Sequence, residues 1–164
     1  MKTLFLLTVV FILAIPNVNA QSFNGGIGVG LPTGDADDFL SFAINADLSY
    51  TWNVSDSFDA GFATGLIYVF GKDWKDGPNT IKVDDGQYLP LAATGKLKVS
   101  DKFFILADLG YAIGINEGND GGFYYRPGIG YGISDSMNIN LSYTGVSQDY
   151  WNYNSINLGL GYKF

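Results

Sequence analysis

The 164-residue chain has no cysteine and no histidine, and only 15% of its residues are charged. Without cysteine there is no disulfide framework, so hydrogen bonds and burial alone must hold the fold. Without histidine the chain lacks the side chain that most often acts as a general base near neutral pH. The 16 acidic residues outnumber the 9 basic ones, so we expect no nucleic-acid partner.

Long apolar runs are also scarce, and the one that is present lies at the amino terminus. Lys2 precedes an apolar run from Leu4 to Ile15, and the small residue Ala20 follows. This order is typical of a secretory signal peptide, and the run is too short to cross a bilayer as a helix. We therefore expect residues 1–20 to be a cleaved signal peptide and residues 21–164 to form one exported domain.

Glycine and aromatic residues are abundant, with 22 glycines and 16% aromatics. After residue 20, apolar residues alternate with small or polar ones in segments that are separated by connectors rich in Gly, Asn, Asp and Ser. Such alternation predicts β-strands. We count eight segments, at Phe23–Leu31, Leu40–Trp52, Phe58–Phe70, Tyr88–Val99, Phe103–Ile115, Phe123–Ile133, Asn138–Val146 and Tyr153–Phe164.

Each predicted strand has one apolar face, and the composition of its other face indicates whether the barrel is soluble or lies in a membrane. In a soluble barrel that face would meet water and carry many Lys and Glu residues. Here it is mostly small or weakly polar, as at Gly61, Ala63 and Gly65, which suits a narrow lumen. The sequence therefore predicts an all-β fold, an eight-stranded antiparallel up-and-down transmembrane β-barrel. A soluble, lipocalin-like secreted barrel that binds a small ligand remains an alternative.

The connectors alternate in length, which sets an orientation. The short ones, Asn53–Ser57, Ser100–Lys102 and Ser134–Met137, are expected to face the periplasm, and the longer ones the outside. Both termini are then periplasmic. Aromatic residues near the strand ends are expected to form two interfacial girdles: Phe23, Trp52, Phe58, Phe103, Tyr162 and Phe164 at one, and Phe42, Tyr68, Phe70, Tyr111, Tyr125 and Tyr153 at the other.

Two prolines lie inside predicted strands, where each removes a hydrogen-bond donor from the ladder. A closed barrel has no free edge at which to place them. We expect a bulge or a strand boundary at Pro90 and at Pro127.

The chain ends on a strand that resembles the closing strand of bacterial outer-membrane barrels. The assembly signal of that family has a polar residue, a glycine and two aromatics at fixed spacing, and Asn157, Gly159, Tyr162 and Phe164 match it. The resemblance implies that the barrel assembly machinery binds this strand during insertion.

The whole region after residue 20 resembles the small eight-stranded outer-membrane proteins of the OmpX and OmpA transmembrane-domain type. Tyr88–Lys96, Asp108–Gly114 and Phe123–Tyr131 look like the β-barrel domain common in Bacteroidetes. The resemblance implies a monomer in the outer membrane of a Gram-negative bacterium, in contact with lipid and lipopolysaccharide, with a structural or surface-interaction role. A narrow OmpW-like transporter of small apolar molecules is the alternative, for which apolar lumen residues would be needed: Ile67, Val69, Phe104 and Leu106.

The few ionised residues on the inner face are nearly balanced in charge: Asp47, Asp59, Lys96, Lys98, Asp108, Arg126 and Lys163. Because an unpaired charge in so narrow a space is costly, we expect these groups to pair and to plug the lumen. We expect Asp108 to lie between Lys96 and Arg126, and Asp59 to lie near Lys98. The aspartates are scattered over three strands, so we expect neither an enzyme nor a cofactor.

The predicted outer loops are acidic and rich in glycine, and none has the spacing of a twelve-residue calcium loop. We expect no metal site in them. Aromatic residues there could contact an extracellular ligand or rest on lipid head groups: Trp74, Tyr150 and Trp151.

Overall fold

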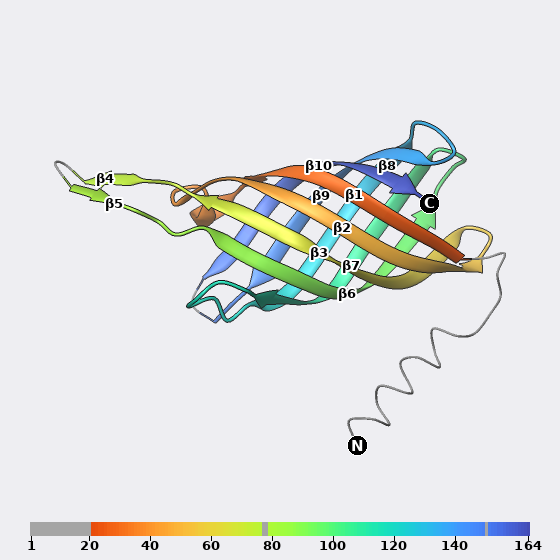
Figure 1. The fold of residues 1–164 in the computed structure, drawn as a ribbon. Helices are drawn as coiled ribbons and strands as arrows, with labels where there is room; N and C mark the ends of the chain where they lie inside the picture. Colours follow the sequence, from red (N-terminus) through yellow and green to blue (C-terminus); the bar gives the residue numbers. More distant parts are fainter. Residues whose placement is uncertain (1–20, 77–78, 150) are drawn as a thin grey trace, which may run out of the picture.

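The computed structural model describes residues 21–76, 79–149 and 151–164. Within these residues eight strands close into one barrel, in the order β1-β10-β9-β8-β7-β6-β3-β2 (Figure 1). Their bounds are β1 Gln21–Pro32, β2 Leu40–Ser55, β3 Phe58–Gly71, β6 Gly86–Lys98, β7 Phe103–Gly114, β8 Gly122–Gly132, β9 Met137–Ser147 and β10 Asn152–Lys163. All eight neighbouring pairs are antiparallel. The predicted fold and its eight strands are confirmed.

The first and last strands close the barrel. Asn24 pairs with Lys163 and Pro32 with Ser155, and the backbone N–H of Phe164 donates to the carbonyl of Phe23 at 2.9 Å. Neither strand therefore keeps a free edge. Both described termini lie at the end that carries the short β2–β3, β6–β7 and β8–β9 turns, which we call the turn end; the opposite end is the loop end (Figure 1).

The longest connector is more ordered than the sequence predicts. Two short strands, β4 (Trp74–Asp76) and β5 (Asn79–Ile81), pair antiparallel within it. This hairpin extends beyond the loop end of the barrel (Figure 1). The side chains of residues 74–81, and with them the predicted contact of Trp74, lie outside the described part of the structure.

The outer surface of the barrel is apolar. Side chains such as Ile27, Phe62, Leu109 and Leu158 are 51–67% exposed, whereas the side chains that alternate with them point inward. Water would be a poor solvent for so continuous an apolar band, and the hydrocarbon of a bilayer is a suitable one. No helix among the described residues has the length and apolarity needed to cross a membrane.

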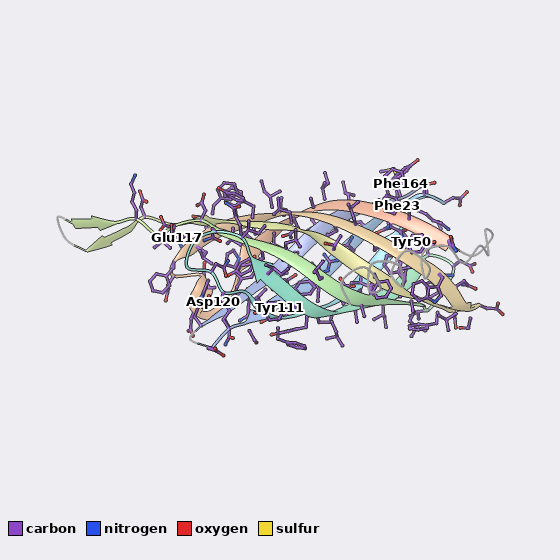
Figure 2. The ribbon with its side chains drawn as sticks, turned by 60° about the horizontal axis from the view of Figure 1, so that its bottom comes forward. Phe23, Tyr50, Tyr111, Glu117, Asp120 and Phe164 are labelled. Carbon is purple, nitrogen blue, oxygen red and sulfur yellow. The ribbon has the colours of Figure 1, made fainter. Side chains whose placement is uncertain are left out.

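Aromatic residues mark both ends of this band. Figure 2 shows Phe23 and Phe164 together at the turn end, and Tyr111 near Asp120 at the loop end. The ring centroids of Phe23 and Phe164 are 5.4 Å apart. Tyr153 is an exception to the predicted girdles, because its side chain is fully buried inside the barrel. It shares the inward face of β10 with Ser155 and Asn157, so its predicted place in a girdle is wrong.

The prolines cause neither a bulge nor a strand end, so that expectation is wrong as well. Pro90 pairs with Ala112 on β7, and Pro127 pairs with Ala107 on β7. On the opposite side of each proline, in the β3–β6 and β8–β9 ladders, two residues are unpaired and the pairing then continues in the same register. The reason is that an antiparallel residue directs its N–H to only one neighbour, so each proline weakens one ladder locally and leaves the other intact.

Candidate functional site

Arg126 lies at the centre of the lumen and links opposite walls of the barrel. It projects from β8, where its direct partner on β7 is Asp108. Its Nε and Nη2 donate to Asp108 Oδ2 at 2.8 and 2.7 Å, and its Nη1 donates to Asp47 Oδ1 at 2.6 Å. Asp47 belongs to β2, which is four strands away from β8 in either direction around the barrel. The side chain of Arg126 therefore reaches across the lumen, and its ion pairs with two carboxylates offset the free-energy cost of burying its charge.

The remaining lumen charges lie nearer the turn end. Lys98 Nζ is 3.2 Å from Asp59 Oδ1. Lys96 forms no ion pair with Asp108 in the described part of the chain, and its ammonium lies 3.9 Å from the centroid of the Phe104 ring. The strand register explains the difference from the prediction, because Thr94 rather than Lys96 lies opposite Asp108.

A water-accessible vestibule of about 440 Å³ occupies this half of the lumen. Polar side chains form most of its wall, and Asp47, Asp108 and Arg126 lie at its inner limit. Lys163 lines it near the turn end, beside Asn138. Phe104 and Leu106 also line it, so these two predicted apolar lumen residues face a mostly polar space.

Beyond Arg126, toward the loop end, three tyrosine side chains are buried inside the lumen. Tyr88, Tyr124 and Tyr153 are 1%, 2% and 0% exposed. Tyr88 on β6 and Tyr153 on β10 stack across the barrel with centroids 5.7 Å apart, and these strands too are four apart in either direction. Ile67 and Val69 belong to the same buried cluster. These apolar residues therefore form a packed layer in the loop-end half of the lumen.

Asn157 connects three strands beside this layer. Its Oδ1 accepts from Asn45 Nδ2 at 2.8 Å, and its Nδ2 donates to Thr144 Oγ1 at 3.0 Å. The first of these bonds passes over Gly30 on the intervening strand β1, where a Cβ would collide with Asn157 Oδ1. The sequence pattern assigns Asn157 to an assembly signal; its buried amide also joins β2, β9 and β10, and only the closed barrel reveals that contact.

Polar side chains from two loops cover the tyrosine layer. Gln148 Nε2 donates to the hydroxyl of Tyr88 at 3.3 Å and to Asn119 Oδ1 at 3.1 Å. Asn119 Nδ2 in turn donates to the backbone carbonyl of Gln87 at 3.0 Å. The sequence does not predict a role for Asn119 and Gln148, because amide side chains in loops carry no periodic signal.

The structure describes the side chain of one of the predicted loop contacts, Trp151. Trp151 is 44% exposed and lines a hollow at the loop end. Tyr150 lies outside the described residues. Among the described residues no group of three or more Asp, Glu, Cys or His side chains could hold a metal ion.

The other predicted assembly residues lie on the last strand as their alternation requires. Tyr162 and Phe164 are 47% and 72% exposed on the outer face, with ring centroids 5.1 Å apart. Gly159 faces inward, where Asn140 occupies the space that a Cβ would need. The strand thus presents an aromatic outer edge at the turn end and a narrow inner face.

Three solved structures that are similar to this chain are outer-membrane or designed barrels. The attachment invasion locus protein Ail of Yersinia pestis is 15% identical, with a TM-score of 0.59 over 88% of this chain and 97% of Ail. The amino-terminal barrel domain of OprF from Pseudomonas aeruginosa is 14% identical, with a TM-score of 0.52 over 87% of this chain and 97% of that domain. A de novo designed transmembrane β-barrel is 14% identical, with a TM-score of 0.56 over 87% of this chain and 95% of the design.

At these identities the likeness concerns the fold alone. A search of the curated proteins gave no match. The family comparison is decisive, since the model of the outer membrane protein beta-barrel domain matches residues 5–164. An outward apolar face and this match together exclude the soluble alternative: the chain belongs to the outer membrane protein beta-barrel domain family.

Proposed function

We propose that this protein is a non-conducting, non-enzymatic barrel of the outer membrane that serves a structural or surface-interaction role through its loops. One observation carries the proposal: two pairs of side chains from opposite walls meet inside the lumen, Arg126 with Asp47 and Tyr88 with Tyr153. An ion or solute would have to break both contacts to pass. Eight-stranded barrels leave room for little more than side chains.

Planar-bilayer recordings test the plug. The wild-type barrel should show no steady conductance, whereas Tyr88→Ala/Tyr153→Ala, which removes the stacked rings, should show channel events at a higher frequency. Large steady conductance of the wild type would overturn the proposal. A matched control is Trp52→Ala/Phe62→Ala, which removes two neighbouring aromatic rings from the outer surface and should leave the recordings unchanged.

The proposal includes the topology inferred from the sequence. Residues 1–20 serve as a cleaved signal peptide, both termini and the short turns face the periplasm, and the barrel assembly machinery inserts the chain as a monomer among outer-membrane lipid and lipopolysaccharide. The lengths of the connectors support this orientation. The four residues of the assembly signal support recognition of the last strand.

The absence of cysteine allows a direct test of the orientation. A membrane-impermeant maleimide applied to intact cells should label Glu117→Cys in a loop and should not label Asp101→Cys in the turn between β6 and β7. Both variants should react after the cells are broken, which controls for expression and accessibility. The reverse labelling pattern on intact cells would contradict the proposed topology.

The charge of the loops argues for a ligand other than a polyanion. Ail of Yersinia pestis has been crystallised in complex with the heparin analogue sucrose octasulfate. In the present chain, the connectors 33–39, 72–85, 115–121 and 148–151 contain ten acidic residues and three lysines. Such a surface repels polyanions, so we do not extend that ligand to this protein.

A further inference from the structure

A hollow of about 420 Å³ lies at the loop end, between the start of β2, the end of β3 and the start of β6. Its inner wall is formed by buried residues of the lumen cluster, among them Leu40, Val69 and Tyr88. Phe39 and Trp151 also line it and are 47% and 44% exposed. The volume falls within the roughly 300–1,000 Å³ of typical small-molecule sites. The buried apolar core of the barrel thus forms the floor of the hollow, and the exposed rings of Phe39 and Trp151 provide its accessible apolar surface.

Two carboxylates line the same hollow. Asp85 accepts hydrogen bonds from the Tyr68 hydroxyl at 2.5 Å and from the Gly71 N–H at 2.8 Å. These bonds, that of Tyr68 first, hold the pKa of the Asp85 carboxyl below its usual range, so the group is ionised at neutral pH. Asp84 makes no hydrogen bond or ion pair in the part of the chain that the structure describes, which leaves its carboxylate available to a ligand.

Charged residues around the hollow add to the negative electrostatic potential of its two carboxylates. The loop-end connectors carry a formal charge of −7, from their ten acidic residues and three lysines. One of the lysines, Lys72, donates a hydrogen bond from Nζ to the backbone carbonyl of Asp37 at 3.0 Å. An apolar hollow in a negative electrostatic potential favours a ligand that has a positive charge and an apolar body.

We propose that the hollow binds a small organic cation, an ammonium group on an aromatic or alkyl body. The apolar body would pack on the exposed rings of Phe39 and Trp151, and the ammonium would pair with Asp84. An aromatic ring near the cation adds a cation–π attraction. A neutral apolar molecule would lack the ion pair, and an anion would be repelled. The proposal deepens the surface-interaction role and rests on the proposed exposure of the loop end.

Three probes of similar size and different charge test the chemistry: phenethylamine, 2-phenylethanol and 3-phenylpropionate. Each is titrated into the purified full-length barrel in detergent, and binding is followed by the indole N–H resonance of Trp151, assigned with Trp151→Phe. Phenethylamine should saturate the shift, 2-phenylethanol should bind at least about tenfold more weakly, and 3-phenylpropionate should not bind. Equal responses to all three would mean partition into detergent and would overturn the proposal.

A pair of matched substitutions locates the ion pair. Asp84→Asn should weaken phenethylamine binding about tenfold, because a charge-assisted hydrogen bond is lost. Asp101→Asn, the same change at the turn end, should leave the affinity unchanged. Wild-type affinity in Asp84→Asn would refute the assigned contact. If phenethylamine fails to bind while Glu117→Cys is labelled on intact cells, the ligand class alone is wrong; if the labelling fails, the proposed topology is wrong.

Discussion

Arg126 and Asp47 lie on opposite walls of the barrel, yet Nη1 of the arginine is 2.6 Å from Oδ1 of the aspartate. The same guanidinium contacts Asp108 on the adjacent strand. A single side chain therefore bridges the lumen and neutralises part of the charge of two carboxylates, one of which is almost fully buried. This arrangement makes the stability of the barrel depend on a complete ionic cluster.

Arg126→Met should lower the free energy of unfolding by about 3 kcal/mol, the lower part of the range for breaking a buried ion pair, because water in the vestibule partly solvates the carboxylates. Arg126→Met/Asp47→Asn/Asp108→Asn should recover most of this loss, since it leaves no unpaired charge. Urea unfolding of the refolded barrel in detergent measures both. Comparable instability of the single and triple variants would contradict a charge-based cause. Lys98→Met, at the exposed pair with Asp59, should cost at most about 1 kcal/mol.

The sequence predicts the strands well because the alternation of apolar and polar residues is local. The ends of each predicted strand lie within three residues of the observed ones. Tyr153 already shared the alternation of Ser155 and Asn157 in the sequence. The inward direction of the Tyr153 side chain could therefore have been predicted from this alternation. Its position near a strand end indicated an interfacial aromatic girdle instead.

The contacts inside the lumen could not be predicted in the same way. Which side chains meet across a barrel depends on the stagger between strands that are not neighbours in sequence. Asp47 is an example, because it reaches Arg126 from the opposite wall. Lys96 is a different case: the register of the β6–β7 hairpin places Thr94 opposite Asp108 and removes Lys96 from the expected cluster. The hydrogen bond between Asn157 and Asn45 likewise depends on closure of β1 against β10.

The lipid-facing assignment predicts a sharp difference between two arginine substitutions. Leu109 is 58% exposed and lies near the middle of β7. Leu109→Arg should lower the free energy of unfolding in lipid by about 2–4 kcal/mol, as expected for a cation near the bilayer midplane. Glu117→Arg, in the exposed loop between β7 and β8, should change it by less than about 0.5 kcal/mol. Equal costs, measured by urea unfolding in vesicles, would count against the proposed membrane depth.

Phe164 is expected to act in assembly beyond its hydrophobic contribution to the girdle. Its ring lies 5.4 Å from that of Phe23, and its backbone closes the barrel. Phe164→Ala should slow insertion in cells, seen as less heat-modifiable, folded protein on unboiled gels. Phe103→Ala is the matched control, since it removes an outward aromatic at the same end from an internal strand. If both variants insert at the same reduced rate, the loss reflects girdle burial and not the assembly signal.

Tyr153 and Tyr88 offer a final comparison because their stacked rings differ in hydrogen bonding. The hydroxyl of Tyr153 is buried with no hydrogen-bond partner in the described structure, whereas that of Tyr88 accepts from Gln148. A buried hydroxyl without a partner retains its desolvation cost, so Tyr153→Phe should leave the free energy of unfolding unchanged or raise it by about 1 kcal/mol. Tyr88→Phe should lower it by about 0.5–1.5 kcal/mol, since it leaves the amide of Gln148 with one acceptor fewer. Both substitutions keep the ring and its packing, so urea unfolding isolates the hydroxyl. A larger loss in Tyr153→Phe than in Tyr88→Phe would show that the Tyr153 hydroxyl has a partner, and an ordered water in the tyrosine layer would then be the group to seek.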